Sequence, residues 1–101
     1  MSGKKAEMET GYNHNILHKG KKYHIQTEDC GVFNPVVLTH LFLEGVVLDT
    51  LKISYSDVLA EGKGVKDRVK ELMKKQHLVM IKRAISGHYD GGREVKEDDE
   101  S

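Results

Sequence analysis

The chain has 101 residues, with 16 basic and 16 acidic side chains, one cysteine and no tryptophan. A chain of this length builds one domain with one modest core and leaves little for a second lobe or a deep cleft. No stretch approaches the roughly 18 to 20 apolar residues that cross a bilayer, no apolar leader segment follows the first methionine, and one cysteine excludes an internal disulfide or a cysteine-rich zinc site. We therefore expect a cytoplasmic, soluble protein with no membrane association and no cofactor.

Both ends of the chain are polar. Residues 1–10 and 90–101 lack apolar periodicity, so burial cannot offset their ordering entropy, and we expect two disordered tails, the second of them acidic. They flank a single domain at residues 11–89. Residues 93–101 hold five acidic and two basic side chains, which leaves the rest of the chain with a net charge of +3. That excess is too small to indicate nucleic-acid binding by itself.

The first predicted element is a β-hairpin. Apolar and polar side chains alternate through residues 12–18 and 23–28, with the period of two that strands show. Glycine in Lys19-Gly20 supplies the positive φ that a two-residue turn requires. One face carries Tyr12, His14, Ile16 and His18. The other face is a polar row that we expect to be the surface most available to a partner: Asn13, Asn15, His24, Gln26 and Glu28.

Three histidines of this hairpin invite a metal site, but strand geometry argues against one. Positions four apart in a strand, such as His14 and His18, are separated by about 13 Å, whereas two nitrogens on one zinc lie no more than about 4 Å apart. His24 lies on the opposite face of the predicted hairpin. We therefore expect no shared metal, and among the three only His14 has a candidate role elsewhere.

Cys30 lies in the loop that joins the two predicted hairpins, in the segment TEDCGVFNP. Glu28 and Asp29 disfavour the thiolate and so raise the thiol pKa, which is the wrong direction for a nucleophile. A cysteine–histidine hydrolase is therefore not favoured, and we expect Cys30 to be a half-buried bystander.

A second hairpin is predicted at residues 36–43 and 46–55, around the turn Glu44-Gly45. This register sets His40 directly opposite Asp49, at about 5 Å. A carboxylate that orients an imidazole is half of many catalytic arrangements, and His14 is a candidate third member. No nucleophile accompanies the pair, and a satisfied polar pair on the sheet explains the same residues. We name no catalytic residue, and a small hydrolase using His40 and Asp49 remains an alternative.

The last predicted element is a long helix that begins near Gly64 or Val65, runs to about Ser86 and ends at Gly87, where glycine permits a left-handed cap. One stripe, expected to face the sheet, contains Val65, Val69, Leu72, Met73, Val79, Met80 and Ala84. A second apolar stripe lies on roughly the opposite side, and both faces of the second hairpin are apolar. We expect a homodimer to cover them through a two-fold interface. The predicted interface residues are Leu78, Ile81, Ile85, Leu41, Leu43, Val46 and Leu48.

The helix is also the most basic segment, with seven basic and two acidic side chains in residues 65–86. The chain lacks the paired aromatic motif of RNA binders that use a sheet, and a solvated lysine face is the commoner explanation of such a helix. Binding of RNA or single-stranded nucleic acid through the helix is therefore an alternative, and nucleic acid is not the partner we favour.

The blocks YNHN, HIQTED and THLF resemble blocks in a group of small bacterial proteins of unknown function that share this length and layout. The resemblance spans roughly residues 11–90. It implies one domain and carries no activity, metal or partner.

Taken together, the patterns predict an α+β fold, in which a four-stranded antiparallel meander of two hairpins is followed by one long C-terminal helix packed on the sheet. The function expected from them is that of a non-catalytic module for protein binding or self-association.

Overall fold

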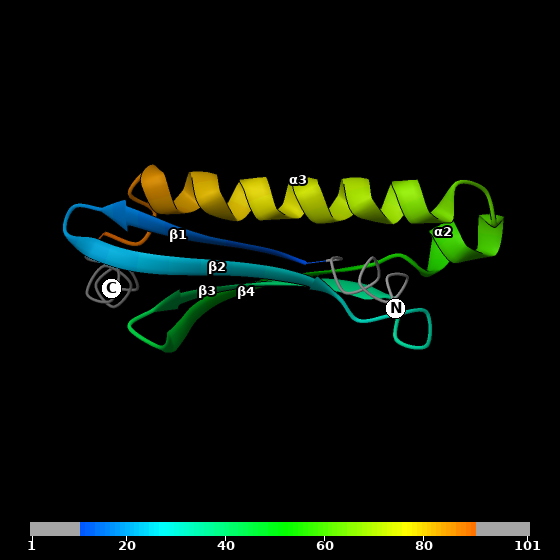
Figure 1. Cartoon of the computed structure of the whole chain (residues 1–101), viewed down its shortest axis with the longest axis horizontal. Coiled ribbons are helices and arrows are strands. Elements are labelled where there is room, and N and C mark those ends of the chain that lie inside the picture. The colour runs from blue at the N-terminus through cyan, green and yellow to red at the C-terminus, as the bar shows by residue number, and fades with distance from the viewer. Residues whose placement is uncertain (1–10, 91–101) are drawn as a thin grey trace, which may run out of the picture.

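The computed structural model describes residues 11–90, so the predicted tails at residues 1–10 and 91–101 lie outside the described residues. It confirms the predicted fold, a four-stranded antiparallel sheet in the order β1-β2-β3-β4 followed by a long C-terminal helix (Figure 1). The elements are β1 (Tyr12–His18), β2 (Lys21–Asp29), β3 (Val36–Leu43), β4 (Val46–Ser54), α2 (Ser56–Glu61) and α3 (Val65–Ile85).

Both hairpin turns occur where the sequence predicts them. Lys19 and Gly20 have φ values of 52° and 79°, and Glu44 and Gly45 have φ values of 54° and 83°. Two consecutive residues with positive φ define the tight turn whose twist matches that of the flanking strands. Because β1–β2 and β3–β4 are both hairpins, the two turns lie at the same end of the sheet (Figure 1).

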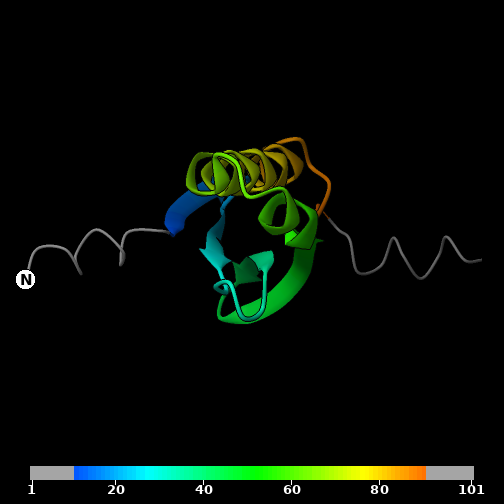
Figure 2. The same ribbon diagram turned by 90° about the vertical axis from the view of Figure 1, so that its right-hand side faces the viewer.

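The molecule has two layers. Helix α3 lies across one face of the sheet, over β1, β2 and β3, and the opposite face has no second layer within residues 11–90 (Figures 1 and 2). Two buried clusters fill the space between helix and sheet. One consists of Tyr23, Ile25, Leu41, Met80 and Ala84, and the other of Val37, Tyr55, Val69 and Met73.

The long helix begins and ends close to its predicted limits. Gly64 precedes it with φ 56°, and Gly87 follows it with φ 89°. The His88 N–H donates to the Arg83 carbonyl at 3.1 Å, which is the bond that closes a glycine-capped helix end. The helix residues that are buried against the sheet are Val69, Met73, His77, Met80 and Ala84. Val79, which we expected in this stripe, is 43 % exposed because it lies six residues after Met73, about 240° around the helix.

Two features of the fold were absent from the sequence analysis. The short helix α2 connects β4 to α3, and Val58 and Leu59 of this helix pack against the second core cluster. The turn after α3 also folds back onto the sheet: Asp90, which we placed in the C-terminal tail, forms ion pairs with His18 at 3.2 Å and Lys19 at 3.1 Å. Within residues 11–90, no helix has the length and apolar character needed to cross a membrane.

The pairing of β3 with β4 contains a β-bulge. Leu41 lies opposite Asp49 and Phe42 lies opposite Val47, so Leu48 has no partner on β3. An extra residue of this kind shifts every later residue of the strand by one position relative to its partner. As a result, Asp49, Leu51 and Ile53 face the helix, the reverse of what an unbroken alternation from the turn would give.

Candidate functional site

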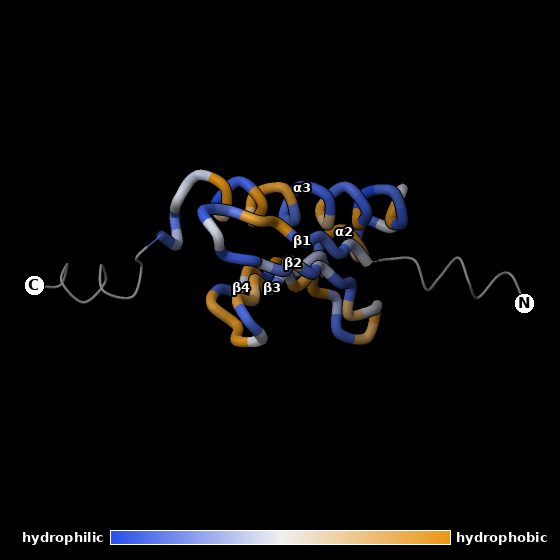
Figure 3. The backbone as a smooth tube through the Cα atoms, turned by 60° about the vertical axis from the view of Figure 1, so that its left-hand side comes forward, coloured by the Kyte–Doolittle hydropathy of each residue, from blue (hydrophilic) through white to orange (hydrophobic). Residues whose placement is uncertain are grey.

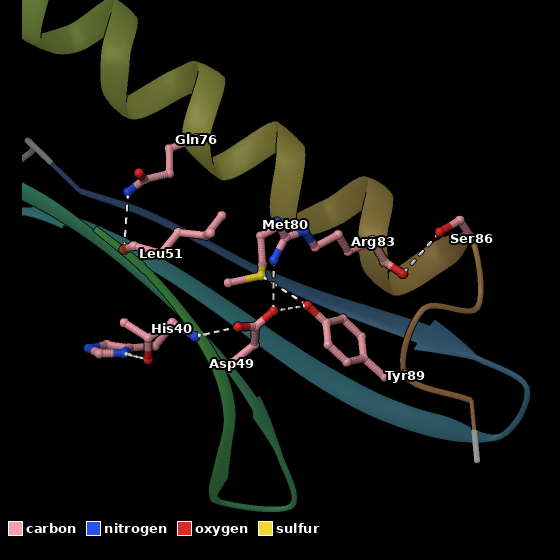
Figure 4. A network of polar contacts seen from close by, with 9 residues as sticks. His40, Asp49, Leu51, Gln76, Met80, Arg83, Ser86 and Tyr89 are labelled. Atoms are coloured by element: carbon pink, nitrogen blue, oxygen red, sulfur yellow. Dashed lines mark hydrogen bonds and ion pairs between the residues drawn. The ribbon is translucent and has the colours of Figure 1, made fainter. Parts of the chain in front are cut away.

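The bulge separates the predicted polar pair. His40 lies opposite Thr50 and Asp49 lies opposite Leu41, so His40 and Asp49 are on different faces of the sheet and the predicted pairing is wrong. His40 Nδ1 is 3.0 Å from Thr50 Oγ1, on the open face. Asp49 points the other way, toward the C-terminal part of α3 (Figure 4).

Asp49 instead joins the sheet to the end of the helix. Arg83 Nη1 donates to Asp49 Oδ2 at 2.9 Å, and the Tyr89 hydroxyl donates to the same oxygen (Figure 4). Burial first, and then the hydrogen bond to Asp49, raise the pKa of Tyr89. The other carboxylate oxygen accepts the backbone N–H of Thr50 at 2.9 Å. This arrangement therefore holds the last turn of α3 and residue 89 against β4, and it contains no nucleophile.

A chain of hydrogen bonds crosses the core from β1 to β3. His14 Nδ1 is 2.8 Å from His77 Nε2, and His77 Nδ1 is 2.8 Å from Thr27 Oγ1. Thr27 Oγ1 is 2.6 Å from Thr39 Oγ1, which also accepts the Gln76 side-chain amide at 3.1 Å. Thr27, Thr39 and His77 are buried, whereas His14 is exposed. This series of hydrogen bonds thus links solvent at the edge of the sheet to the middle of the core.

His77 is the member of this hydrogen-bond series that the sequence analysis missed. Only 3 % of its surface is exposed. Burial lowers the pKa of His77 to about 4, and the neighbouring His14 and His24 imidazoles act in the same direction. His77 therefore stays neutral at ordinary pH, with one ring nitrogen donating and the other accepting. Its position was available from the sequence, because it lies four residues after Met73 and seven before Ala84, on the buried stripe.

The remaining hairpin histidines are divided between the faces as predicted. Tyr12, His14, Ile16 and His18 share the helix side of β1, while His24 lies on the open face, where its Nδ1 is 2.9 Å from Asn15 Oδ1. Within the described part of the chain, no three side chains of the histidine, cysteine or carboxylate type are grouped as metal ligands. His14, the suggested third member, contacts His77 and neither His40 nor Asp49.

The predicted polar row shares the open face of the sheet. Asn13 lies opposite Gln26, and Asn15 lies opposite His24. On β3 the same face continues with Leu38, His40 and Phe42, which pair with Glu28, Gln26 and His24 of β2. The Phe42 ring lies 5.9 Å from both the His24 and His40 rings. The open face is therefore a mixed surface of amides, imidazoles and apolar side chains.

The predicted interface residues fall into three groups. Leu41 is fully buried in the core of the monomer, where it lies opposite Ile25 on the face that α3 covers, so its assignment to an interface is wrong. Leu43 and Ile81 are half-buried against that core. The others are exposed to solvent, and Figure 3 shows the apolar colour of the β3–β4 hairpin that carries two of them: Leu78, Ile85, Val46 and Leu48.

Cys30 is half-buried in the β2–β3 loop. Burial raises the pKa of its thiol, and the Glu28 and Asp29 carboxylates raise it further. This shift is in the direction expected from the sequence, and it lowers the fraction of reactive thiolate at neutral pH.

Comparison of the chain with protein-family models, with curated proteins and with solved structures finds no match in any of the three. The geometry of the chain's own residues therefore carries the functional interpretation.

Proposed function

We propose that this chain is a non-catalytic module that binds a second copy of itself through the exposed apolar stripe of α3. The main support for this proposal is that Leu78 and Ile85 are 49 % and 52 % exposed, with half-buried Ile81 between them. Their spacings of three and four residues place the three side chains on one side of the helix. Burial of such a stripe between two copies removes apolar surface from water and stabilises the pair by about 25 cal/mol per Å² buried.

The polar groups of the domain support a binding role over catalysis. Asp49 and His77 are engaged in hydrogen bonds that connect secondary-structure elements. His40, the predicted partner of Asp49, is hydrogen-bonded to Thr50 on the opposite face. The hydrolase alternative required His40 and Asp49 to act together, and their separation removes its basis.

Light scattering coupled to gel filtration tests the proposal. The full-length chain is expected to run as a dimer at micromolar concentration, and the double variant Leu78→Glu/Ile85→Glu is expected to run as a folded monomer. Val47→Glu is the matched control, because Val47 is 48 % exposed but lies on the β3–β4 hairpin. A folded wild-type chain that remains monomeric throughout this range would contradict self-association.

The lysines of α3 support a second candidate function, the binding of single-stranded nucleic acid. Lys66, Lys70, Lys74, Lys75 and Lys82 are all exposed. The two arginines of the helix are committed elsewhere, Arg68 to Glu61 at 2.7 Å and Arg83 to Asp49 at 2.9 Å. Fluorescence anisotropy with a labelled oligonucleotide tests this function, since binding through lysines weakens steeply as salt is added.

A further inference from the structure

We propose that the second copy binds by strand addition: β1 of each chain pairs antiparallel with β1 of the other, about a two-fold axis at Asn15, and forms one eight-stranded sheet. This inference rests on the self-association proposed above. It adds the contact surface, the partner strand and the register.

The hydrogen-bond phase of the sheet shows which backbone groups of β1 are free. The Cys30 N–H donates to the Val36 carbonyl at 3.0 Å, so the backbone N–H and C=O groups of the even-numbered β3 residues point toward β2. In an antiparallel ladder, alternate residues point to opposite sides. With the observed registers, the even-numbered residues of β1 then bond to β2, and Asn13, Asn15 and Leu17 direct their N–H and C=O groups outward. Within residues 11–90 these outward groups have no hydrogen-bond partner.

The two edges of the sheet differ in how they are protected. Strand β4 has a bulge at Leu48, a charged side chain at Lys52, and an outward Thr50 N–H that Asp49 Oδ1 already occupies at 2.9 Å. These are recognised protections against edge pairing. Strand β1, with the sequence YNHNILH, has no lysine, arginine, carboxylate or proline and no bulge. The β1 edge is therefore the one open to another strand.

The sequence of β1 selects a second β1 as the partner in one register. The outward backbone N–H and C=O groups belong to odd-numbered residues, so two β1 strands can bond only when odd-numbered residues lie opposite odd-numbered residues. In such a register the helices of both copies lie on the same face of the joined sheet. Of these registers, the one centred on Asn15 alone pairs all seven residues. It sets Asn15 against Asn15 of the other copy and Asn13 against Leu17. His24 Nδ1 already holds Asn15 Oδ1 at 2.9 Å, which leaves the amide N–H groups of the two asparagines free to donate across the axis.

The apolar stripe of α3 lies on the same flank of the molecule. His77 of the helix bonds to β1, whereas Gln76 and Arg83 bond toward β3 and β4. At 100° per residue, Leu78, Ile81 and Ile85 lie about 40° to 100° from His77 in the direction away from Gln76. The buried stripe of the helix is centred about 40° from His77 on the Gln76 side, so these three side chains lie on the β1 flank of the helix and turn away from the sheet. Two-fold pairing of β1 would bring the two flanks toward each other.

The spacing between the two helices follows from the sheet. Three strand spacings separate β2 from its symmetry copy, about 14 Å. Helices centred over these strands would be further apart than the 8–10 Å of directly packed helices. Because a helix with its side chains is about 10–12 Å across, the two apolar stripes would face each other across a narrow groove above the paired β1 strands.

Disulfide trapping tests the register in the full-length chain with Cys30 replaced by serine. Asn15→Cys is expected to form a covalent dimer rapidly under mild oxidation, because paired Cα atoms lie about 5.5 Å apart, within disulfide range. Asn13→Cys is the matched control: the two copies of residue 13 lie about 14 Å apart along the strands, so it is expected to react at least tenfold more slowly. A mixture of Asn13→Cys and Leu17→Cys chains is expected to form the mixed dimer.

Asn15→Pro supplies a second readout that needs no cysteine. Proline is tolerated at an outward position of an edge strand but removes the donor needed for pairing, so this variant should stay folded and become monomeric. A wild-type dimer that survives Asn15→Pro and traps Asn13→Cys as fast as Asn15→Cys would overturn strand addition while leaving self-association intact. A monomeric wild type whose Asn15 amide is protected from hydrogen exchange would show that the chain's own tail covers the edge, and it would overturn both proposals.

Discussion

His14 and His77 are 63 positions apart in the chain and share a hydrogen bond of 2.8 Å, although one imidazole is exposed and the other is buried. The bond joins the edge strand β1 to the middle of α3. Protonation of His77 places a charge in the core, so this link makes the stability of the fold sensitive to acid.

The first prediction concerns pH. Folding lowers the pKa of His77 from 6.5 to about 4, so the unfolded chain binds a proton more readily, and the stabilising difference present above pH 6.5 is lost as the pH falls toward 4. We expect the free energy of unfolding to fall by about 1 kcal/mol between pH 7 and pH 5.5. Urea unfolding at these two pH values measures the change. His77→Gln should reduce this pH dependence; equal slopes in the wild type and in His77→Gln would refute the assignment.

The second prediction compares two threonines that each contact a histidine Nδ1. Thr27 is buried beside His77, whereas Thr50 is exposed beside His40. Thr27→Val leaves a buried imidazole nitrogen without its partner and should cost about 1–3 kcal/mol of unfolding free energy. Thr50→Val should change it by less than about 0.5 kcal/mol, because water replaces the lost hydroxyl. Chemical denaturation at pH 7 measures both. Similar losses of unfolding free energy in the two variants would show that the buried series of hydrogen bonds does not stabilise the fold.

The third prediction compares two buried tyrosines. The Tyr55 hydroxyl donates to Asp29 Oδ1 at 2.6 Å, whereas the Tyr23 hydroxyl is buried without a partner in the described part of the chain. Tyr55→Phe should therefore destabilise the fold by about 1–2 kcal/mol, since it removes a hydrogen bond to a carboxylate oxygen, which then keeps only the Gly31 N–H at 2.9 Å. Tyr23→Phe should be neutral or stabilising, because it removes an unsatisfied polar group. A destabilising Tyr23→Phe change would reveal a partner, such as an ordered water molecule.

The fourth prediction tests the bulge. Deletion of Leu48 retains every observed pair between β3 and β4, so this variant should fold with the same cross-strand NMR contacts. Deletion of Thr50 is the control. This deletion would place Asp49 directly before Leu51, so either Asp49 or both Leu51 and Ile53 would have to face away from the helix. It should therefore be the more destabilising deletion. The reverse order of stability would mean that β4 is registered differently.

The fifth prediction concerns thiol chemistry. Because burial and then Glu28 and Asp29 raise the pKa of Cys30, alkylation by iodoacetamide at pH 8 should be several-fold slower than that of a free thiol. Glu28→Gln should increase the rate modestly without unfolding the chain. A rate above that of the free thiol would reopen the possibility of a nucleophilic cysteine.

The order of strands, the two hairpin turns and the limits of α3 were predictable because each depends on local chemistry. Gly20 and Gly45 mark positions with positive φ, and Gly87 marks the end of a helix. The division of His14 from His24 followed from strand alternation alone, and the register confirms it.

The site was less predictable, since it depends on contacts between distant segments. Nothing local distinguishes Leu48 as the extra residue of a bulge, and the bulge puts Asp49 on the helix side of the sheet, where it reaches Arg83. One unpaired residue was enough to send His40 and Asp49 to opposite faces. His77 was hidden for a different reason, because a histidine within an apolar stripe reads as a break in the stripe until Thr27 and His14 are seen beside it.

The unequal protection of the two sheet edges sets a limit on growth. If both edges were open, each added copy would offer a new edge, and the chain could polymerise without end. Here the Asp49 carboxylate occupies the Thr50 N–H on one side, so a pair joined through β1 would present only its two protected β4 edges to solvent. A single side chain that reaches back to its own backbone would thereby separate a closed dimer from a fibre.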